Sequence, residues 1–465
     1  MMRLFDTSTF VADDKKEGEI PKFKKVAKDV MKIVWPSMLE GFLVALVTMF
    51  DGIQVSGIGN NANSAVTITK QPIFLMISFI TAINIALTAI VSRRFGEKNQ
   101  EAVNKAMYTG IKLSFIVSLL LSVIVCIFAE PLCNLMGATV NTLEYAKTYL
   151  FIISAGFIFN GLRLTINACQ RGIGKTKISM LTNLVANIVN VCLNYLLING
   201  YYGFPTLGIA GAALATVIGN AVAFLISFAT ILPKKAYLRF DVKKFFKMES
   251  DTFKNIMQIL PSTLFDQLLI RFGFIIFALI VNYLGDDATY VHGICNDINS
   301  LMFTLADGFA IGTSAIVGHR LGEKRKDLAL VYAKVSMMIS FGCAILVSIF
   351  VVTCRGFLIG LYQPETIERE NTAMLILLIA AIMMLPQNTS WVMTGVLRGS
   401  GDTKFTAIVS LVCIVFVRPI SSVLLCYPIG LGVVGAWIGM IFDQAVRLTL
   451  NTWRFRQKKW LQIKL

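Results

Sequence analysis

Residues 395–408 read GVLRGSGDTKFTAI, and residues 167–180 read NACQRGIGKTKISM. Both stretches carry Arg-Gly-x-Gly-x-Thr-Lys between apolar segments, with Arg398 in one at the place of Arg171 in the other. Two more pairs recur at nearly the same separation, namely TAIVSRRFGEKN at 88–99 with SAIVGHRLGEKR at 314–325, and IVWPSMLE at 33–40 with QILPSTLF at 258–265. Because unrelated loops would not share one separation, the sequence predicts two copies of one structural unit.

The composition indicates a membrane protein. The chain has 465 residues, of which 56% are hydrophobic and 15% charged, whereas soluble domains carry about 25% charged residues. Apolar runs such as 73–91, 113–128 and 331–352 are long enough to cross a hydrocarbon core of about 30 Å as helices. Such helices satisfy their own backbone hydrogen bonds, and the alternating pattern of a membrane β-barrel is missing from the sequence.

Twelve apolar spans are expected. Their approximate limits are 33–58, 70–92, 110–128, 147–168, 178–199, 208–232, 256–284, 294–318, 331–353, 372–397, 406–427 and 429–450. The nine cysteines are scattered, without the C-x-x-C pairs typical of zinc or redox sites. No enzyme motif of the metalloprotease, nucleophile-elbow or phosphate-loop type is found, so we do not expect an enzyme.

The basic residues that give the net charge of +16 lie mainly outside the apolar spans. Lys and Arg gather in both tails and in alternate loops, whereas the loop NGYYGFPTLG at 199–208 has none. We expect the chain to lie in the cytoplasmic membrane. The positive-inside rule then places both termini and both hinges on its cytoplasmic side. The basic charge therefore indicates topology, and no nucleic-acid partner is expected. The segment 1–30 lacks the apolar core of a signal peptide.

Six spans per copy is an even number, so the two copies are parallel repeats that can form two lobes around a central cavity. Each hinge would connect the fourth and fifth helices of its repeat, with glycine allowing the reversal and Arg171 or Arg398 held at the anionic inner leaflet. The predicted divisions are a cytoplasmic tail at 1–32 with an amphipathic helix at 22–32, an N-lobe at 33–232, a cytoplasmic linker at 233–255, a C-lobe at 256–450 and a basic cytoplasmic tail at 451–465.

These motifs resemble the multidrug and toxic compound extrusion (MATE) family over about residues 30–450. The resemblance is carried by the two hinges, by FDGIQVSGIG at 50–59, by GIAGAALATVIG at 208–219 and by VGHRLGEKRKDLA at 317–329. The first hinge departs from the family pattern, because Lys175 stands where the second hinge has Asp402. The resemblance implies a secondary antiporter that expels organic, often cationic, compounds in exchange for Na⁺ or H⁺.

The first repeat contains the main candidate for ion coupling. Asp51 lies in the apolar stretch ALVTMFDGIQV, where a carboxylate is costly unless it faces water or a partner. It can accept a proton or bind Na⁺; it can also simply be hydrated at the end of its span. The resemblance implies the coupling role. Asn187, Asn190 and Asn194 form one polar stripe, which can bind a cation with Thr216 or join helices by hydrogen bonds.

The second repeat offers further candidates in Asp266, Asp297, Asp307 and Gln387. The resemblance implies an acidic residue near Asp266 and another near Gln387 in the NorM-like branch, so one carboxylate is replaced here by an amide. It also implies an aspartate at Asn194 in the DinF-like branch. In the twelfth span, Asp443 and Arg447 have the spacing of an ion pair. The hinge residues expected to act structurally are Arg171, Gly172, Arg398, Gly399 and Asp402.

The sequence therefore predicts an antiporter that exports organic small molecules by alternating access. A flippase for lipid-linked saccharides is the alternative, since related families share a duplicated bundle. No cofactor is expected besides the coupling ion, and the chain is expected to act as a monomer surrounded by membrane lipids.

Overall fold

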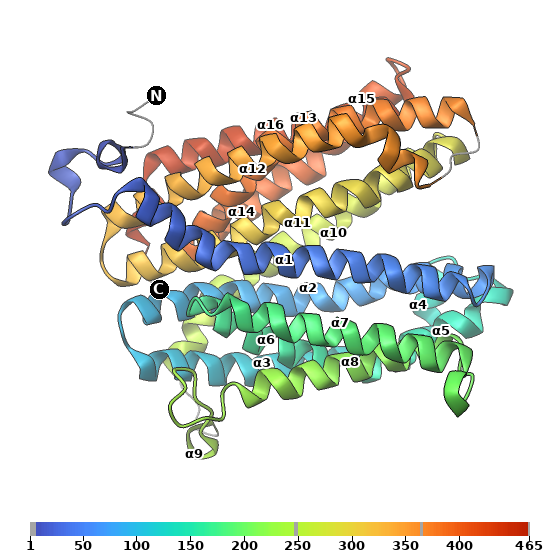
Figure 1. Cartoon of the computed structure of the whole chain (residues 1–465), viewed down its shortest axis with the longest axis horizontal. Coiled ribbons are helices and arrows are strands. Elements are labelled where there is room, and N and C mark those ends of the chain that lie inside the picture. Colours follow the sequence, from blue (N-terminus) through green and yellow to red (C-terminus); the bar gives the residue numbers. More distant parts are fainter. Residues whose placement is uncertain (1–5, 246–249, 363–365, 464–465) are drawn as a thin grey trace. The chain divides into compact units, whose positions relative to one another are not determined.

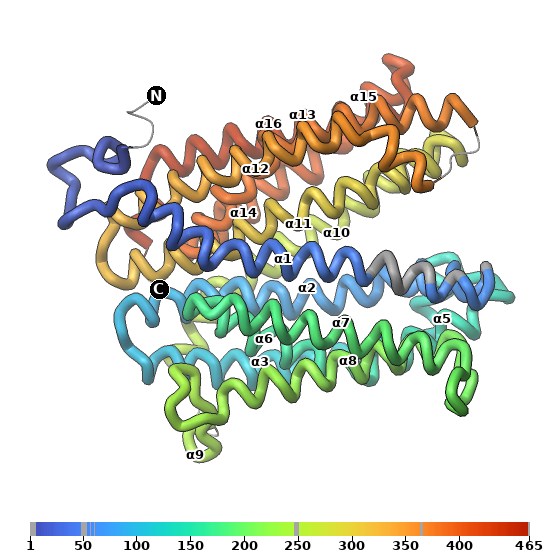
Figure 2. The backbone as a smooth tube through the Cα atoms, in the orientation of Figure 1, coloured from blue at the N-terminus to red at the C-terminus, as the bar shows by residue number. Residues whose placement is uncertain are grey.

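The computed structural model describes residues 6–245, 250–362 and 366–463, and it leaves the side chains of residues 48–53, 56, 60 and 250 undescribed (Figure 2). Regular structure in the described part is helical throughout. The described residues contain eleven helical segments long and apolar enough to cross a membrane, or twelve if one bent pair is counted as a single span. The predicted all-α polytopic fold is therefore confirmed.

Contacts divide the chain into two compact units. We call Phe42–Leu260 the N-unit, and Met1–Gly41 together with Pro261–Leu465 the C-unit. The unit boundaries lie inside α1 (Phe23–Ser56) and α10 (Ser250–Asn282), so the start of the chain groups with the second repeat. The lobes predicted at 33–232 and 256–450 follow the sequence repeat instead. They place residues 33–41 in the N-lobe, whereas these residues belong to the C-unit.

The N-unit is a bundle of helices around an apolar core that includes Met76, Ile80, Leu150 and Phe157. Helices α7 and α8 run side by side in it (Figure 1). Besides its parts of α1 and α10, it contains α2 (Asn60–Gly96), α3 (Gln100–Ile127), α4 (Ala129–Leu135), α5 (Val140–Ala155), α6 (Phe157–Gly172), α7 (Thr176–Asn199), η4 (Tyr201–Gly203), α8 (Ile209–Ala229) and α9 (Val242–Phe245).

Apolar clusters of described residues lie in the C-unit around Trp437 and Met384 and around Phe309 and Trp460. Helix α13 packs against α11, α12 and α16 (Figure 1). Besides its parts of α1 and α10, the unit contains η2 (Thr7–Phe10), η3 (Asp13–Lys15), α11 (Asp286–Gly322), α12 (Lys326–Gly360), α13 (Ile367–Ser400), α14 (Thr403–Ser410), the π-helical η5 (Leu411–Val417), α15 (Arg418–Cys426), α16 (Gly432–Gln457) and η6 (Lys459–Gln462).

The duplication is visible in the backbone of the turns. Gly174 and Gly401 of the two hinges have φ of 80° and 90°, and Lys98 and Lys324 of the other matched stretches have φ of 58° and 59°. In each turn an amide bonds back to the carbonyl five positions earlier, which is the Schellman arrangement that closes a helix. The predicted role of glycine in the hinges is thus fulfilled by Gly174 and Gly401.

Two predicted spans are less regular than the sequence suggests. The span expected at 147–168 is divided at Gly156, where α5 and α6 meet at 47°. A Cβ atom on Gly156 would overlap Val217 Cγ1 of α8, so the break occurs where a neighbouring helix comes very close. The eleventh span contains the π-helical turn η5 between α14 and α15.

The amphipathic helix predicted at 22–32 is present, but it is not separate, because it continues into the first span. Residues from Phe23 onward are the first turns of α1, and Val26 and Val30 are fully buried in the core of the C-unit. A helix that packs one face against a protein core has the same apolar stripe as a helix that lies on a membrane surface. The sequence pattern alone therefore does not distinguish these two kinds of helix. Val11, further upstream, is buried in the same cluster.

The segment before α1 covers the start of α12. Glu17 Oε2 accepts a hydrogen bond of 2.6 Å from the Lys326 amide, and the Glu17 amide donates to Asp327 Oδ2 at 3.1 Å. Arg325 donates to the carbonyl of Glu19 and to both carboxylate oxygens of Asp327. The hydrogen bonds to Asp327 raise the pKa of the Arg325 guanidinium. Glu17 thus caps a helix that belongs to the second repeat.

Replacing Glu17 by Ala should release this segment. Losing a helix cap costs about 1 kcal/mol, which corresponds to about fivefold more of the opened state and a similar rise in proteolysis. Limited digestion with trypsin should therefore cut after Lys15 and Lys16 about fivefold faster. Glu19→Ala is the matched control, because only the Glu19 carbonyl takes part in the described contacts. Equal rates in the two variants would contradict the capping role.

Candidate functional site

The polar contact between α7 and α8 contains two of the residues predicted for ion coupling. Asn190 Nδ2 donates to Thr216 Oγ1 at 3.0 Å, and Thr216 donates to the Ala212 carbonyl. A Cβ atom on Gly219 would lie 2.8 Å from the Ala186 carbonyl oxygen, so the two backbones approach each other closely here. Asn190 therefore joins the helices in the way that the packing alternative described.

The other asparagines continue this stripe along α7. Asn194 is buried, with 1% of its surface exposed, and Asn187 is half-buried. The stripe also extends one turn earlier to Asn183, which the prediction left out. Val191, one position beyond Asn190, accepts a 3.5 Å hydrogen bond from Gln54 of α1. The N-unit thus brings the C-terminal part of α1 to the polar stripe of α7.

Asp51 belongs to α1, but its side chain lies outside the described residues. Its predicted roles as coupling residue and Na⁺ ligand are therefore untested by these contacts. Among the described residues no three His, Cys, Asp or Glu side chains form a group able to hold a metal ion.

Arg163 of α6 is a buried cation that the sequence prediction missed. It is 7% exposed, and its guanidinium donates to Asn183 Oδ1 and, at 2.9 Å, to Asn160 Oδ1. The signal in the sequence was the single charge within FIFNGLRLTIN at 157–167. A lone cation in an apolar helix indicates a polar partner inside the bundle.

The first hinge is held by polar contacts within the N-unit. Arg171 Nη1 donates to Ser179 Oγ at 2.8 Å. Gly172 is the last residue of α6, and a Cβ atom on it would lie 2.7 Å from Val91 Cγ1 of α2. Gly172 is thus a packing glycine, whereas Gly174 makes the turn.

The second hinge is fastened by an ion pair with a predicted site residue. Arg398 Nη2 donates to Asp266 Oδ2 at 2.8 Å, and the side chains are 12% and 0% exposed. The expectation that Arg398 lies against lipid headgroups was therefore wrong, because its guanidinium faces a buried carboxylate inside the C-unit. Gln387 is buried on the same helix as Arg398.

The other hinge residues are also internal. Asp402 accepts hydrogen bonds of 2.7 and 3.2 Å from Arg454 of α16. A Cβ atom on Gly399 would overlap the Ser314 carbonyl oxygen, so Gly399 allows α13 to pack closely on α11. The second hinge is therefore tied to three helices of the C-unit.

Asp297 and Asp307 lie on α11, ten positions apart. Asp297, Asn296 and Ser300 are exposed, and Asp307 is half-buried. A polar face in an apolar helix is costly toward lipid, so this face is suited to a water-filled space. These two aspartates are not brought into contact with Asp266 or Gln387 by any described bond.

Asp443 of α16 joins two arginines. It forms an ion pair with Arg418 of α15, and its Oδ1 lies 3.7 Å from Arg447 Nη2. The predicted pair of Asp443 with Arg447 therefore exists, but Arg418 is the closer partner. The sequence could not show this, because Arg418 lies on another helix.

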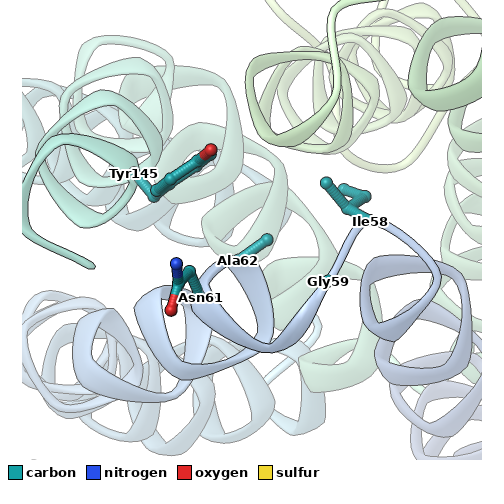
Figure 3. Close-up of a pocket in the computed structure, with 5 residues that line it drawn as sticks. All are labelled: Ile58, Gly59, Asn61, Ala62 and Tyr145. Carbon is teal, nitrogen blue, oxygen red and sulfur yellow. The ribbon is translucent and has the colours of Figure 1, made fainter. Parts of the chain in front are cut away.

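A small pocket of about 180 Å³ lies at the turn between α1 and α2 (Figure 3). Ile58, Gly59, Asn61, Ala62 and Tyr145 line it, and Figure 3 shows Tyr145 approaching it from α5. None of the predicted site residues is among them. The pocket thus adds no support to those residues.

The sequence matches the MatE family over residues 36–196 and 262–424, one stretch in each repeat. It is 27% identical to the "Uncharacterized transporter YisQ" of Bacillus subtilis, covering 93% of this chain and 95% of that protein. It is 26% identical to the "Probable multidrug resistance protein NorM" of Thermotoga maritima, covering 95% and 94%.

Solved structures share the fold. One described as the outward-facing conformation of a multidrug resistance MATE family transporter of the MOP superfamily matches with a TM-score of 0.88 and 18% identity, covering 94% of this chain and 97% of that one. Because the family match includes most of both repeats, and the helices and hinges of the structure agree with it, the chain belongs to the MatE family of membrane transporters.

Proposed function

We propose that this transporter exports organic small molecules, often cationic or amphipathic, across the cytoplasmic membrane in exchange for Na⁺ or H⁺. Relatives named as probable multidrug resistance proteins support the export of drugs. The observation that carries the proposal is the polar stripe of α7 within an apolar bundle, since intramembrane polar groups mark transport pathways. Both termini would be cytoplasmic, and the chain would act as a monomer among lipids.

Ion coupling is assigned to the first repeat. Asp51 belongs to α1, and Gln54 of the same helix contacts α7 beside Asn190. Asn187, Asn190, Asn194 and Thr216 supply neutral oxygens that can help to hold a cation. Asp51 would take up Na⁺ or a proton differently in the two states of the transport cycle.

Reconstitution into liposomes tests the function. Export of a panel of organic cations and amphiphiles would be followed under a pure Na⁺ gradient and then under a pure pH gradient. Uptake or release that depends on one gradient identifies the coupling ion. If no compound moves under either gradient while a lipid-linked saccharide changes leaflet, the protein is a flippase instead.

The orientation predicts which positions can be labelled from outside the cell. In a variant without the native cysteines, a cysteine introduced by Asp286→Cys should react with an impermeant maleimide in intact cells. A cysteine introduced by Lys244→Cys should react only after permeabilisation, because residue 244 lies in the basic linker assigned to the inner side. Both native side chains are exposed, so accessibility does not limit the reaction. Labelling of the Lys244→Cys variant in intact cells would overturn the assigned topology.

A further inference from the structure

The C-unit contains a buried cluster of charges that the proposed transport mechanism does not use. It consists of Arg418, Asp443 and Arg447, whose side chains are 9%, 0% and 3% exposed. Two guanidinium groups face one carboxylate, and arginine does not release its proton in proteins. The cluster therefore has an excess of one positive charge in a setting where an unbalanced charge is costly.

The contacts of Arg447 are weaker than those of Arg418. Arg418 forms a close ion pair with Asp443 through Nε and Nη2. Arg447 reaches Asp443 only at 3.7 Å and Ser410 Oγ at 3.4 Å, whereas charged N–H···O bonds are usually about 2.7–2.9 Å. Its Nε has no hydrogen-bond partner among the described residues. The excess charge is thus located on Arg447.

Arg398, a further arginine near Arg447, has no such excess of positive charge. Arg398 is balanced by Asp266 at 2.8 Å. The guanidinium carbons of Arg398 and Arg447 lie 5.5 and 5.9 Å from the centre of the same ring, that of Trp391. The ring offsets part of a positive charge, but it is a weaker partner than an anion.

The helix beside the cluster is irregular. The π-helical η5 begins directly after Ser410 and ends directly before Arg418, and π-helical turns are frequent at functional sites. A Cβ atom on Gly273 of α10 would overlap Ile414 Cγ2, so α10 packs onto this turn. Of the two residues that bracket η5, Ser410 contacts Arg447 and Arg418 belongs to the cluster.

We propose that Arg447, with the Ser410 hydroxyl as second donor, binds a monovalent anion. The excess charge and the unpaired Nε point to a halide or to the carboxylate group of an organic compound. Both have one negative charge and accept hydrogen bonds, so the structure assigns this chemistry and the experiment separates the two sources. The site is independent of Asp51 and of the coupling ion.

Iodide is the probe, because it quenches tryptophan fluorescence at short range and Trp391 lies against Arg447. The full-length protein in lipid nanodiscs would be titrated at constant ionic strength with fluoride as the balancing anion. The wild type should show a saturable component of quenching that Trp391→Phe removes. Arg447→Gln should remove it as well, and Arg447→Lys should weaken the affinity about tenfold or more.

Arg454→Gln is the matched control, since Arg454 is on the same helix but is already paired with Asp402. It should keep the saturable component. Competition by chloride alone would identify an inorganic counter-ion, whereas competition by benzoate as well would identify a site for organic carboxylates. Saturable quenching that survives in folded Arg447→Gln or in Trp391→Phe would overturn the proposal, as would its absence from the wild type.

Discussion

Gradient-driven export should be lost when Asp51 is replaced by Asn. The substitution keeps the size of the side chain and removes its charge, so the folded protein should accumulate normally. A coupling site that no longer discriminates between the two states of the cycle cannot use the gradient. We expect the initial rate of export to fall at least about tenfold, which corresponds to a rise of about 1.4 kcal/mol or more in the activation free energy of transport.

The export assay in liposomes measures this rate, with substrate binding as a second readout. Binding should be largely retained, because apolar contacts dominate the affinity for organic compounds. Asp286→Asn is a suitable control, since Asp286 is an exposed acid at the start of α11. If Asp51→Asn exports at the wild-type rate while Asp297→Asn, or the folded and inserted fraction of Asp266→Asn, is inactive, coupling belongs to the second repeat.

Breaking the ion pair between Asp266 and Arg398 should destabilise the protein strongly. Removing one partner of a buried pair costs about 3–5 kcal/mol, because the remaining charge stays buried without compensation. Asp266→Asn and Arg398→Gln should each lower the thermal midpoint and the yield of inserted protein. The molecules that do fold should still bind substrate with nearly normal affinity, because the pair fastens a hinge.

A double-mutant cycle tests the pair. The variant with both Asp266→Asn and Arg398→Gln removes both charges of the pair, so it should be more stable than either single variant. Asp402→Asn is the matched comparison, because Arg454 is 20% exposed and can be hydrated when its partner is removed. Strictly additive losses in the double variant would show that the pair contributes no specific interaction.

The features that could be predicted from sequence are those encoded by neighbouring residues. The helical class follows from apolar runs, and the repeated turns follow from glycines and basic residues that recur at one separation. Gly174 and Gly401 illustrate this, since a positive φ is a local property. Asn190 could be chosen because asparagines recur at helical spacing along 187–194, and Thr216 because it is a hydroxyl in an apolar stretch; the two side chains form one contact.

Features that depend on packing between distant segments could not be predicted. Arg398 was assigned to the lipid surface because the sequence shows its charge but not that its partner is Asp266, on a helix far earlier in the chain. The break at Gly156 depends on Val217 of another helix. The same limit explains why Arg163, which donates to Asn183 and Asn160, gave only a weak signal.

The cap that Glu17 places on α12 has a consequence for how the protein can be divided. A duplicated transporter can be divided at the linker, and each half can then be produced from its own plasmid. Here a fragment beginning at residue 261 would lack the segment that covers α12, and the apolar surface against which Val26 and Val30 pack would be uncovered. A fusion partner attached directly before residue 6 would lie next to the segment that packs against α12. Residues 6–41 should therefore accompany the second half in any two-gene version of the protein.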